Sequence, residues 1–203
     1  MIPVQLIIHT TLTADTITTT QLALEGGCKW VRLHFDTHFQ GEKETLARQM
    51  LALCRKYKAT FVIDSDVDLC KTIEADGVHL FETDMAANEA RERLGHEFII
   101  GTTAHCFEDV KQQKRLSADY VCLGPLRAKE GAIGLQGYAE VLEEMENEEL
   151  RMPLCAFGGI TQADVLPLLR AGVQGVAVSS AITESSHPQD TMQAFLNADE
   201  EGV

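Results

Sequence analysis

The chain has 203 residues, 45% of them hydrophobic, and a formal net charge of −14. This length supports one sizeable core and is short for two, so we expect a single domain over residues 1–203. The acidic balance argues against nucleic acid as a partner, because binding a polyanion needs clustered Lys and Arg. No apolar run approaches the length of a membrane span, and the first residues do not resemble a cleavable signal, so we expect no membrane partner.

Eight short runs rich in Val, Ile and Leu alternate with segments of helical periodicity. The expected strands are, in chain order, Val4–His9, Trp30–Phe35, Thr60–Ile63, Gly77–Leu80, Phe98–Ile100, Tyr120–Leu123, Leu154–Ala156 and Gly175–Val178. Alternating strands and helices predict a parallel sheet, and eight units predict its closure into a single (β/α)8 TIM barrel. An open doubly wound sheet remains the alternative, because the sequence does not show that the last strand pairs with the first. A Rossmann fold is less consistent, since no G-x-G-x-x-G motif follows the first strand.

Cysteines and acidic residues have a simple structural interpretation. Six cysteines are scattered singly among apolar residues, without a C-x-x-C pair or a histidine at metal-ligand spacing. We expect them to be reduced core residues, which favours the cytoplasm. The acidic run Glu140–Glu149 is expected to be the solvated face of a helix, and Asp199–Glu201 a frayed end.

Gly124–Gly137 is the longest stretch without a clear pattern, and it is rich in glycine. It follows the sixth expected strand. A loop of this length on a small barrel is expected to cover an active site, with a surface loop of no function as the alternative.

Small residues follow the last two expected strands, at Gly158, Gly159, Ser179 and Ser180. Such residues leave backbone N–H groups uncovered where the next helix begins, and these groups attract an anion. In many (β/α)8 enzymes a phosphate lies between the last two loops. The sequence therefore predicts a phosphate site at these four residues, with a tight strand-to-helix turn as the structural alternative for the glycines.

Several motifs recur in a fixed order along nearly the whole chain. They are Cys28–Leu33, Val67–Leu69, Ala75–Leu80 with Asp84, Gly101–His105, Ala118–Pro125, Pro153–Ile160 and Gly175–Ile182. In this order and spacing they resemble the thiamin phosphate synthase family. The resemblance implies a barrel that couples pyrimidine methyl diphosphate with thiazole phosphate, releasing diphosphate and giving thiamin phosphate, with Mg2+ assisting the departure of diphosphate. It also implies that the partner is a small phosphate ligand, thiazole phosphate or thiamin phosphate.

The second expected strand departs from the family pattern. The family carries Gln, Arg and Lys at alternate positions in W-V-Q-L-R-x-K, and those positions hold Arg32, His34 and Asp36 here. Alternate side chains of a strand share a face, so all three are expected to point into the barrel mouth. The family's Lys attracts the substrate's diphosphate, by about 3 kcal/mol for unit charges about 5 Å apart. Asp36 at the same position repels the diphosphate instead. Arg32 and Asp36 are candidate substrate contacts, but the sequence does not decide whether coupling takes place.

The metal and loop motifs of the family are also altered. The family's N-D-R run corresponds to Asp64–Asp66, so Ser65 stands where a metal carboxylate is expected, while Asp84 matches the other metal ligand. We take Asp84 as the candidate Mg2+ ligand and Asp64 as a candidate substrate contact. The loop after the sixth strand lacks the family's T-x-T-K ending, and Lys129 or Arg127 is the candidate replacement.

Histidines supply the candidate catalytic groups. His34 is expected beside Asp36 and Asp66, where a carboxylate would raise its pKa toward general acid or base use, with a packed neutral imidazole as the alternative. His105 is the second candidate, and Thr103 beside it is a candidate substrate contact. His79 fits a hydrogen-bonded core histidine as well as a catalytic one.

Three functions therefore remain open. The first is a coupling enzyme with a rearranged diphosphate site. The second is a paralogue that acts on thiazole phosphate alone, as thiazole tautomerases of this family do, and uses His34 or His105 to move a proton. The third is a non-catalytic binder of the phosphate ligand. Closed barrels of this kind often pair, so a homodimer is one expected state, although no sequence feature selects an interface.

Overall fold

The computed structural model describes residues 3–10 and 15–198. Its strands are β1 (Val4–His9), β2 (Trp30–His34), β3 (Thr60–Asp64), β4 (Gly77–Leu80), β5 (Ile99–Ala104), β6 (Tyr120–Leu123), β7 (Leu154–Phe157) and β8 (Gly175–Val178). Its helices are α1 (Thr16–Glu25), α2 (Lys43–Lys56), α3 (Val67–Ile73), α4 (Ala87–Leu94), α5 (Phe107–Arg115), α6 (Gly134–Asn147), α7 (Gln162–Ala171), α8 (Ser180–Thr183) and α9 (Pro188–Leu196). The expected frayed end Asp199–Glu201 lies outside the described residues.

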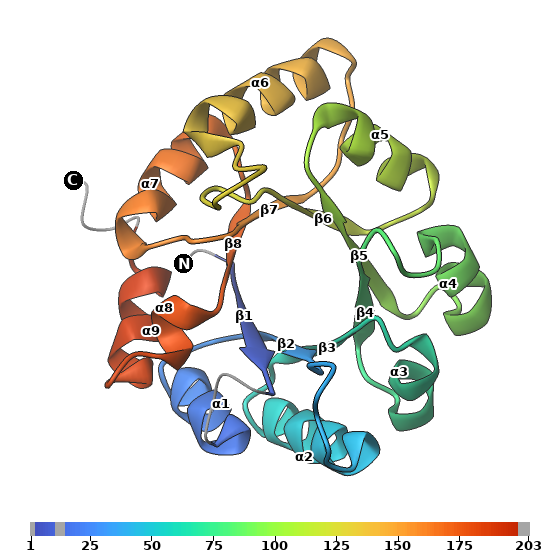
Figure 1. Ribbon diagram of the computed structural model, residues 1–203, viewed down its shortest axis with the longest axis vertical. Coiled ribbons are helices and arrows are strands. Elements are labelled where there is room, and N and C mark those ends of the chain that lie inside the picture. Colours follow the sequence, from blue (N-terminus) through green and yellow to red (C-terminus); the bar gives the residue numbers. More distant parts are fainter. Residues whose placement is uncertain (1–2, 11–14, 199–203) are drawn as a thin grey trace.

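The eight strands close into one parallel barrel with the helices around it (Figure 1). Each strand pairs with the next, and β8 pairs with β1 in a register that sets Val176 opposite Val4. The predicted TIM barrel is confirmed, and the open-sheet alternative is wrong because this last pairing removes both sheet edges.

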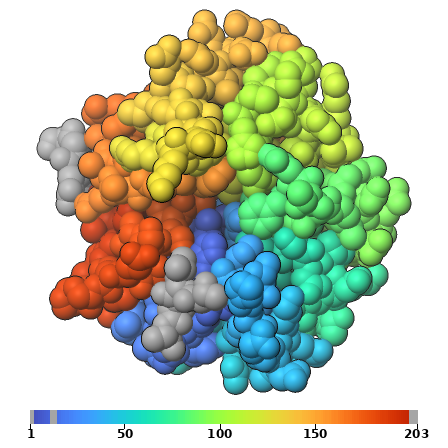
Figure 2. All heavy atoms as spheres, viewed as in Figure 1, coloured from blue at the N-terminus to red at the C-terminus, as the bar shows by residue number. Residues whose placement is uncertain are grey.

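The barrel has two layers of packing that follow the alternation of its strands. In β1, Leu6 and Ile8 are fully buried in the larger core, which lies between the strands and the helices. Ile7, between them, belongs instead to a small cluster inside the barrel with Trp30 and Tyr120. Side chains fill the centre of the barrel, as the space-filling view shows (Figure 2). The carboxyl ends of the strands therefore form a lined mouth above a filled interior.

Strands β2, β3 and β7 end one residue from their expected bounds, and two other boundaries differ by more. Strand β5 runs to Ala104 instead of ending at Ile100. Gly101 and Thr103 face Tyr120 and His79 inside the barrel, so this part of the strand lacks the apolar pattern of the others. Helix α6 begins at Gly134, so the loop after β6 covers only residues 124–133. This loop packs on the end of β7, where Leu126 N–H donates to the Phe157 carbonyl oxygen at 2.7 Å.

The outer surface agrees with most of the expectations. The glutamates of Glu140–Glu149 are exposed, while α6 buries Tyr138, Val141 and Met145. All six cysteines are free, and five are buried, but Cys106 is exposed at the start of α5, so its prediction as a core residue is wrong. None of the described helices has the length and apolarity needed to cross a membrane.

Candidate active site

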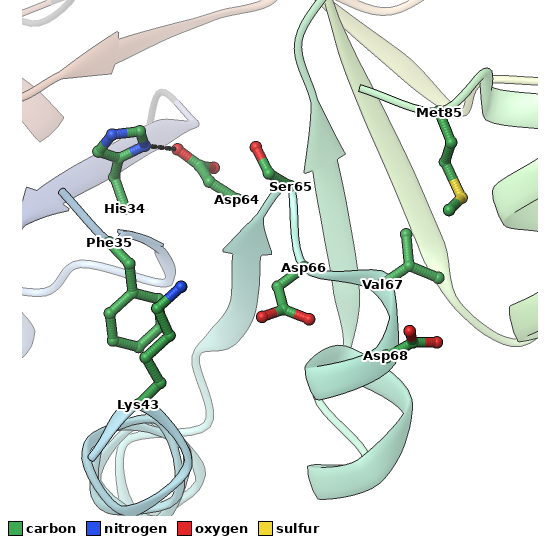
Figure 3. A pocket seen from close by; sticks show the side chains of 9 residues that line it. All are labelled: His34, Phe35, Lys43, Asp64, Ser65, Asp66, Val67, Asp68 and Met85. Carbon is green, nitrogen blue, oxygen red and sulfur yellow. Dashed lines mark hydrogen bonds and ion pairs between the residues drawn. The ribbon is translucent and has the colours of Figure 1, made fainter. Parts of the chain in front are cut away.

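A buried ion pair supports the β2–β3 side of the mouth. The Arg32 side chain is 5% exposed, and its Nε donates to Oδ1 of Asp64 at 2.5 Å. The other oxygen of Asp64 accepts from Nδ1 of His34 at 2.9 Å, as Figure 3 shows. Burial alone would raise the pKa of Asp64, but the charge of Arg32 and the bond from His34 lower it. Arg32 and Asp64, both expected to contact substrate, are paired with each other, and a contact of either with substrate stays a prediction.

His34 has a different carboxylate partner from the one expected. His34 was expected beside Asp36 and Asp66; Asp36 does lie close to it, but the carboxylate that bonds to it is Asp64, and this bond raises the pKa of His34. Asp66 instead caps α3 by accepting from the Leu69 N–H at 2.9 Å. Asp66 does not bond to His34 because it follows the strand, where the helix cap requires its side chain.

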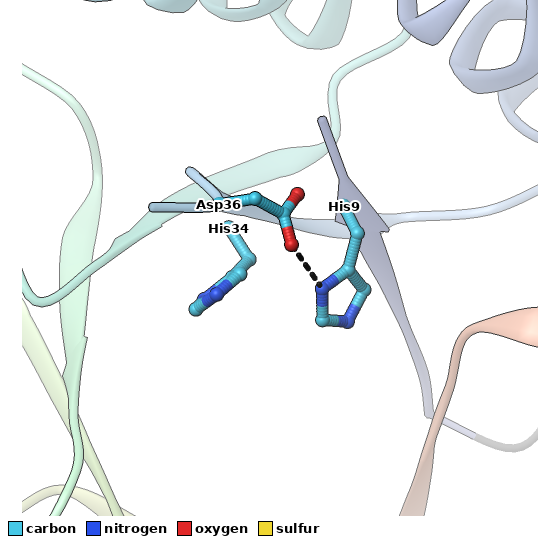
Figure 4. A group of neighbouring side chains, drawn as sticks. All are labelled: His9, His34 and Asp36. Atoms are coloured by element: carbon cyan, nitrogen blue, oxygen red, sulfur yellow. Dashed lines mark ion pairs between the residues drawn. The ribbon is translucent and has the colours of Figure 1, made fainter. Parts of the chain in front are cut away.

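A second histidine, which the sequence analysis missed, lies next to His34. The β1–β2 register sets His9 directly opposite His34, with ring centroids 4.8 Å apart. Nδ1 of His9 lies 3.8 Å from Oδ1 of Asp36 (Figure 4). Burial, followed by the neighbouring His34, lowers the pKa of His9. The signal was present, since His9 continues the inward alternation of Gln5 and Ile7 along β1.

Below this group the barrel interior holds a second polar network. His79 is fully buried, with Nε2 bonded to Thr103 Oγ1 at 3.0 Å and Nδ1 to Tyr120 Oη at 3.1 Å. Tyr120 in turn accepts from Gln5 at 2.9 Å. Burial lowers the pKa of His79 well below its usual range, so it is a neutral, hydrogen-bonded core histidine. Thr103 is 9% exposed and belongs to the same network, so its contact with substrate stays a prediction.

The position expected to bind Mg2+ has few free ligands. Oδ2 of Asp84 accepts from Ser65 Oγ at 2.7 Å and from the Phe81 N–H at 2.8 Å. Within the described residues, Asp84 belongs to no group of three or more carboxylate, histidine or cysteine ligands. The residues present therefore do not form a Mg2+ site by themselves, and Mg2+ at Asp84 remains a prediction on which no chemical step is built.

His105 lies on another part of the rim. Its Nδ1 bonds to the Gly124 carbonyl oxygen and its Nε2 to Oε1 of Glu82, both at 2.6 Å. It contacts neither His34 nor Asp64 through any described hydrogen bond, so the two candidate catalytic histidines do not form one pair. A catalytic role for either remains a prediction.

The four predicted phosphate residues line one cavity. Gly158, Gly159, Ser179 and Ser180 surround a space of about 190 Å³ between the ends of β7 and β8, next to His9. In the described loops, no backbone–backbone hydrogen bond uses the N–H of Gly159 or Ser180 as donor. The buried Oγ of Ser179 likewise has no hydrogen-bond partner among the described residues. A buried hydroxyl without a partner is rare, so Ser179 in this cavity offers a group that a polar ligand would satisfy, beside the exposed Gly159 and Ser180.

The glycines of this cavity also have a structural reason. A Cβ at Gly158 would lie 2.3 Å from Cβ of Pro125, and one at Gly159 would lie 3.1 Å from Cβ of Arg127. Both glycines have positive φ, 91° and 63°, which favours glycine. The tight turn and the open cavity are thus features of the same backbone, and neither interpretation excludes the other.

The two cationic side chains of the loop after β6, Arg127 and Lys129, lie in different surroundings: the first is paired and the second is exposed. Both Nη atoms of Arg127 bond to Asp164, at 2.6 and 2.5 Å, and Nη1 also donates to the Gly159 carbonyl oxygen at 3.0 Å. Arg127 therefore fastens this loop to the turn after β7. Lys129 is exposed, and its role as a substrate contact stays a prediction.

Comparison with known proteins decides the family. Residues 4–182 match the family model described as thiamine monophosphate synthase. The chain belongs to the thiamine monophosphate synthase family. Its relatives include a thiamine-phosphate synthase of Bacteroides fragilis, 39% identical over 97% of this chain and 100% of that protein. Another, from Flavobacterium johnsoniae, is 40% identical over 88% of this chain and 87% of that protein.

The solved structures agree. The chain resembles a thiamine phosphate pyrophosphorylase from Pyrococcus furiosus with a TM-score of 0.88 and 26% identity, over 98% of this chain and 96% of that one. The resemblance predicted from the motifs is therefore confirmed. Membership of the thiamine monophosphate synthase family supports a role in thiamin biosynthesis.

Proposed function

We propose that this family member binds thiazole phosphate, with the phosphate in the cavity between β7 and β8. The observation that carries the proposal is the convergence of Gly159, Ser179 and Ser180 on one cavity, with donors that the described protein does not use. A phosphate accepts several hydrogen bonds at once and is stabilised by backbone N–H groups that need no counter-charge. The organic part of the ligand would extend along Ile7 and His9 toward the mouth.

The opposite side of the mouth offers little to a diphosphate. A pocket of about 270 Å³ at the ends of β2 and β3 is lined by Asp64, Asp66 and Asp68, with Lys43 as the one cation among its lining residues (Figure 3). Arg32 is buried against Asp64, and Arg127 is paired with Asp164. Each Asp near a diphosphate adds a repulsion of about 3 kcal/mol at about 5 Å. We therefore infer that coupling of the two substrates is slow in this chain.

Calorimetry with thiazole phosphate tests the binding site. Ser180→Asp places a carboxylate in the cavity, and we expect it to weaken binding about a hundredfold, the equivalent of about 3 kcal/mol. Ser186→Asp makes the same change at an exposed residue outside the cavity and should bind like the unaltered chain. No binding by the unaltered chain, or equal binding by both variants, would refute the phosphate site.

Diphosphate release tests the inference on coupling. Both substrates are mixed with Mg2+, and the rate is compared with that of the Bacteroides fragilis relative under the same conditions. We expect a rate at least tenfold lower for this chain. An equal rate would show that the acidic pocket does not limit coupling, and it would leave the phosphate site untouched.

A further inference from the structure

We propose that His9, His34 and Asp36 bind a divalent transition-metal ion at the β1–β2 end of the mouth. One nitrogen of each histidine and one oxygen of Asp36 lie within 4.8 Å of one another. Within the described residues, this is the one group of three or more such ligands. The proposal does not depend on thiazole phosphate binding, because the ligands belong to β1 and the end of β2 and not to the β7–β8 turns.

The fold brings the three ligands together through strand register. His9 and His34 are paired across β1 and β2, so their side chains leave the barrel wall side by side. Asp36 lies two residues after His34 and therefore continues on the same face. Figure 4 shows the Asp36 carboxylate pointing toward the His9 ring, with His34 beside them. Each side chain is between 22% and 29% exposed, which leaves an entry path from solvent.

A buried carboxylate holds His34 in the orientation that a ligand needs. Asp64 accepts from Nδ1 of His34 and is itself fixed by the buried Arg32. Because an ionised carboxylate only accepts, Nδ1 holds a proton in this bond, so in the neutral ring the lone pair is on Nε2. A histidine that donates its other ring N–H to a carboxylate is the usual arrangement behind a metal ligand, since it fixes the tautomer and the ring. Asp64 is therefore a positioning residue of this site.

The ligand set indicates the kind of metal. Two imidazoles and one carboxylate suit Zn2+, Fe2+, Co2+ or Ni2+, whereas Mg2+ prefers oxygen ligands. Around a bound ion the ligand atoms would lie about 3–3.5 Å apart, so small side-chain rotations would bring the three ligands together. Three protein ligands leave at least one coordination position open, and His9 also lines the β7–β8 cavity. At the end of the mouth that holds Asp36, the ion would supply positive charge close to an anionic ligand bound in the β7–β8 cavity.

The test measures metal binding by the full chain without any substrate. Calorimetry with Zn2+ above neutral pH is expected to show one ion per chain, and Mg2+ should bind at least a hundredfold more weakly. Asp36→Asn, which preserves shape, and His9→Ala should each weaken Zn2+ at least tenfold. His96→Ala removes an exposed histidine outside the group and should leave binding unchanged. Circular dichroism checks that each variant is folded, and Asp36→Asn decides the matter if His9→Ala does not fold.

Co2+ absorption identifies the ligand atoms. A nitrogen and oxygen site gives weak visible bands, whereas coordination by the exposed Cys106 gives an intense thiolate band in the near ultraviolet. We expect the unaltered chain with Co2+ to show the weak visible bands. Their intensity should fall in Asp36→Asn and stay the same in Cys106→Ser. Absence of Zn2+ binding, binding that Asp36→Asn does not weaken, or a thiolate band that Cys106→Ser removes would overturn the proposal.

Discussion

At the β7–β8 end of the mouth, backbone turns line the cavity, whereas at the β1–β3 end charged side chains line the pocket and bond to one another. Gly158 and Gly159 shape the first end through positive φ and close packing on the loop after β6. At the second end, Asp64 joins Arg32 to His34. A backbone site survives most side-chain changes, while a side-chain site changes its chemistry with two or three substitutions. Under the proposed function, this difference is the reason why one half of the ligand site would be retained while the other changes.

The largest effect is expected at the buried pair. Asp64→Asn leaves the Arg32 charge buried without its partner, and removing one member of such a pair destabilises a protein by about 3–5 kcal/mol. Denaturant unfolding measures the loss. Glu44→Gln breaks an exposed Arg48 pair in α2 and should change stability by no more than about 0.5 kcal/mol. Equal effects of the two variants would show that the β1–β3 end is not held by buried charge.

The backbone end is tested with a matched pair of glycines. Gly158 and Gly95 have nearly the same φ, 91° and 94°, but a Cβ meets Pro125 at Gly158 and nothing within 4 Å at Gly95. Both changes to Ala carry the strain of positive φ, and Gly158→Ala should lose about 1–3 kcal/mol more because of overpacking. Thermal unfolding of both variants measures this difference. If the two lose the same stability, close packing does not shape this cavity.

Replacing two acidic or neutral side chains at and after the end of β2 by cations should change anion binding at that end of the mouth and leave the β7–β8 cavity unchanged. The double variant His34→Arg with Asp36→Lys returns cations to positions where the family pattern carries them. We expect inorganic diphosphate to bind at least tenfold more tightly than to the unaltered chain, about 1.4 kcal/mol, because a repulsion becomes an attraction. Calorimetry measures the affinity, and thiazole phosphate binding serves as the internal control, since it should stay unchanged. Unchanged diphosphate binding would mean that these two residues do not set the charge of the site.

The smallest effect concerns the loop after β6 at acid pH. The hydrogen bonds from Arg127, followed by those from Thr161, lower the pKa of Asp164 to about 2. A carboxyl group with a lowered folded pKa contributes stability above its ordinary value near 3.8 and loses it as the pH falls toward 2. Arg127→Met should therefore lose less stability than the unaltered chain over this range, as followed by thermal unfolding. Arg151→Met, at an exposed arginine, should keep the full pH dependence.

The sequence was sufficient for the fold and for residue groups that lie close along the chain. Four of the strands match the prediction, because β1, β4, β6 and β8 are short apolar runs between polar residues. Gly158, Gly159, Ser179 and Ser180 could be grouped because consecutive strands of a parallel barrel open at the same end. Closure was predicted from the count of eight units, but the strand pairing that achieves it, β8 with β1, joins residues far apart in sequence and had to be read from the structure.

The hydrogen-bond partners inside the barrel could not be predicted from the sequence. The partner of His34 is Asp64 because the β2–β3 register and the buried Arg32 bring the two side chains together, and alternation along β2 alone does not fix that choice. The hydrogen bond between Thr103 and His79 likewise joins side chains of different strands, and no feature of the sequence indicates it. His9 was within reach of the sequence, because alternation along β1 already pointed it inward.

The most direct test of the difference between the two ends is the position of a bound ligand. A crystal structure of the chain with thiazole phosphate should show phosphate oxygens within hydrogen-bonding distance of the Gly159 and Ser180 N–H groups and of Ser179 Oγ. A phosphate bound at the β2–β3 pocket beside Lys43, with the β7–β8 cavity vacant, would contradict this account.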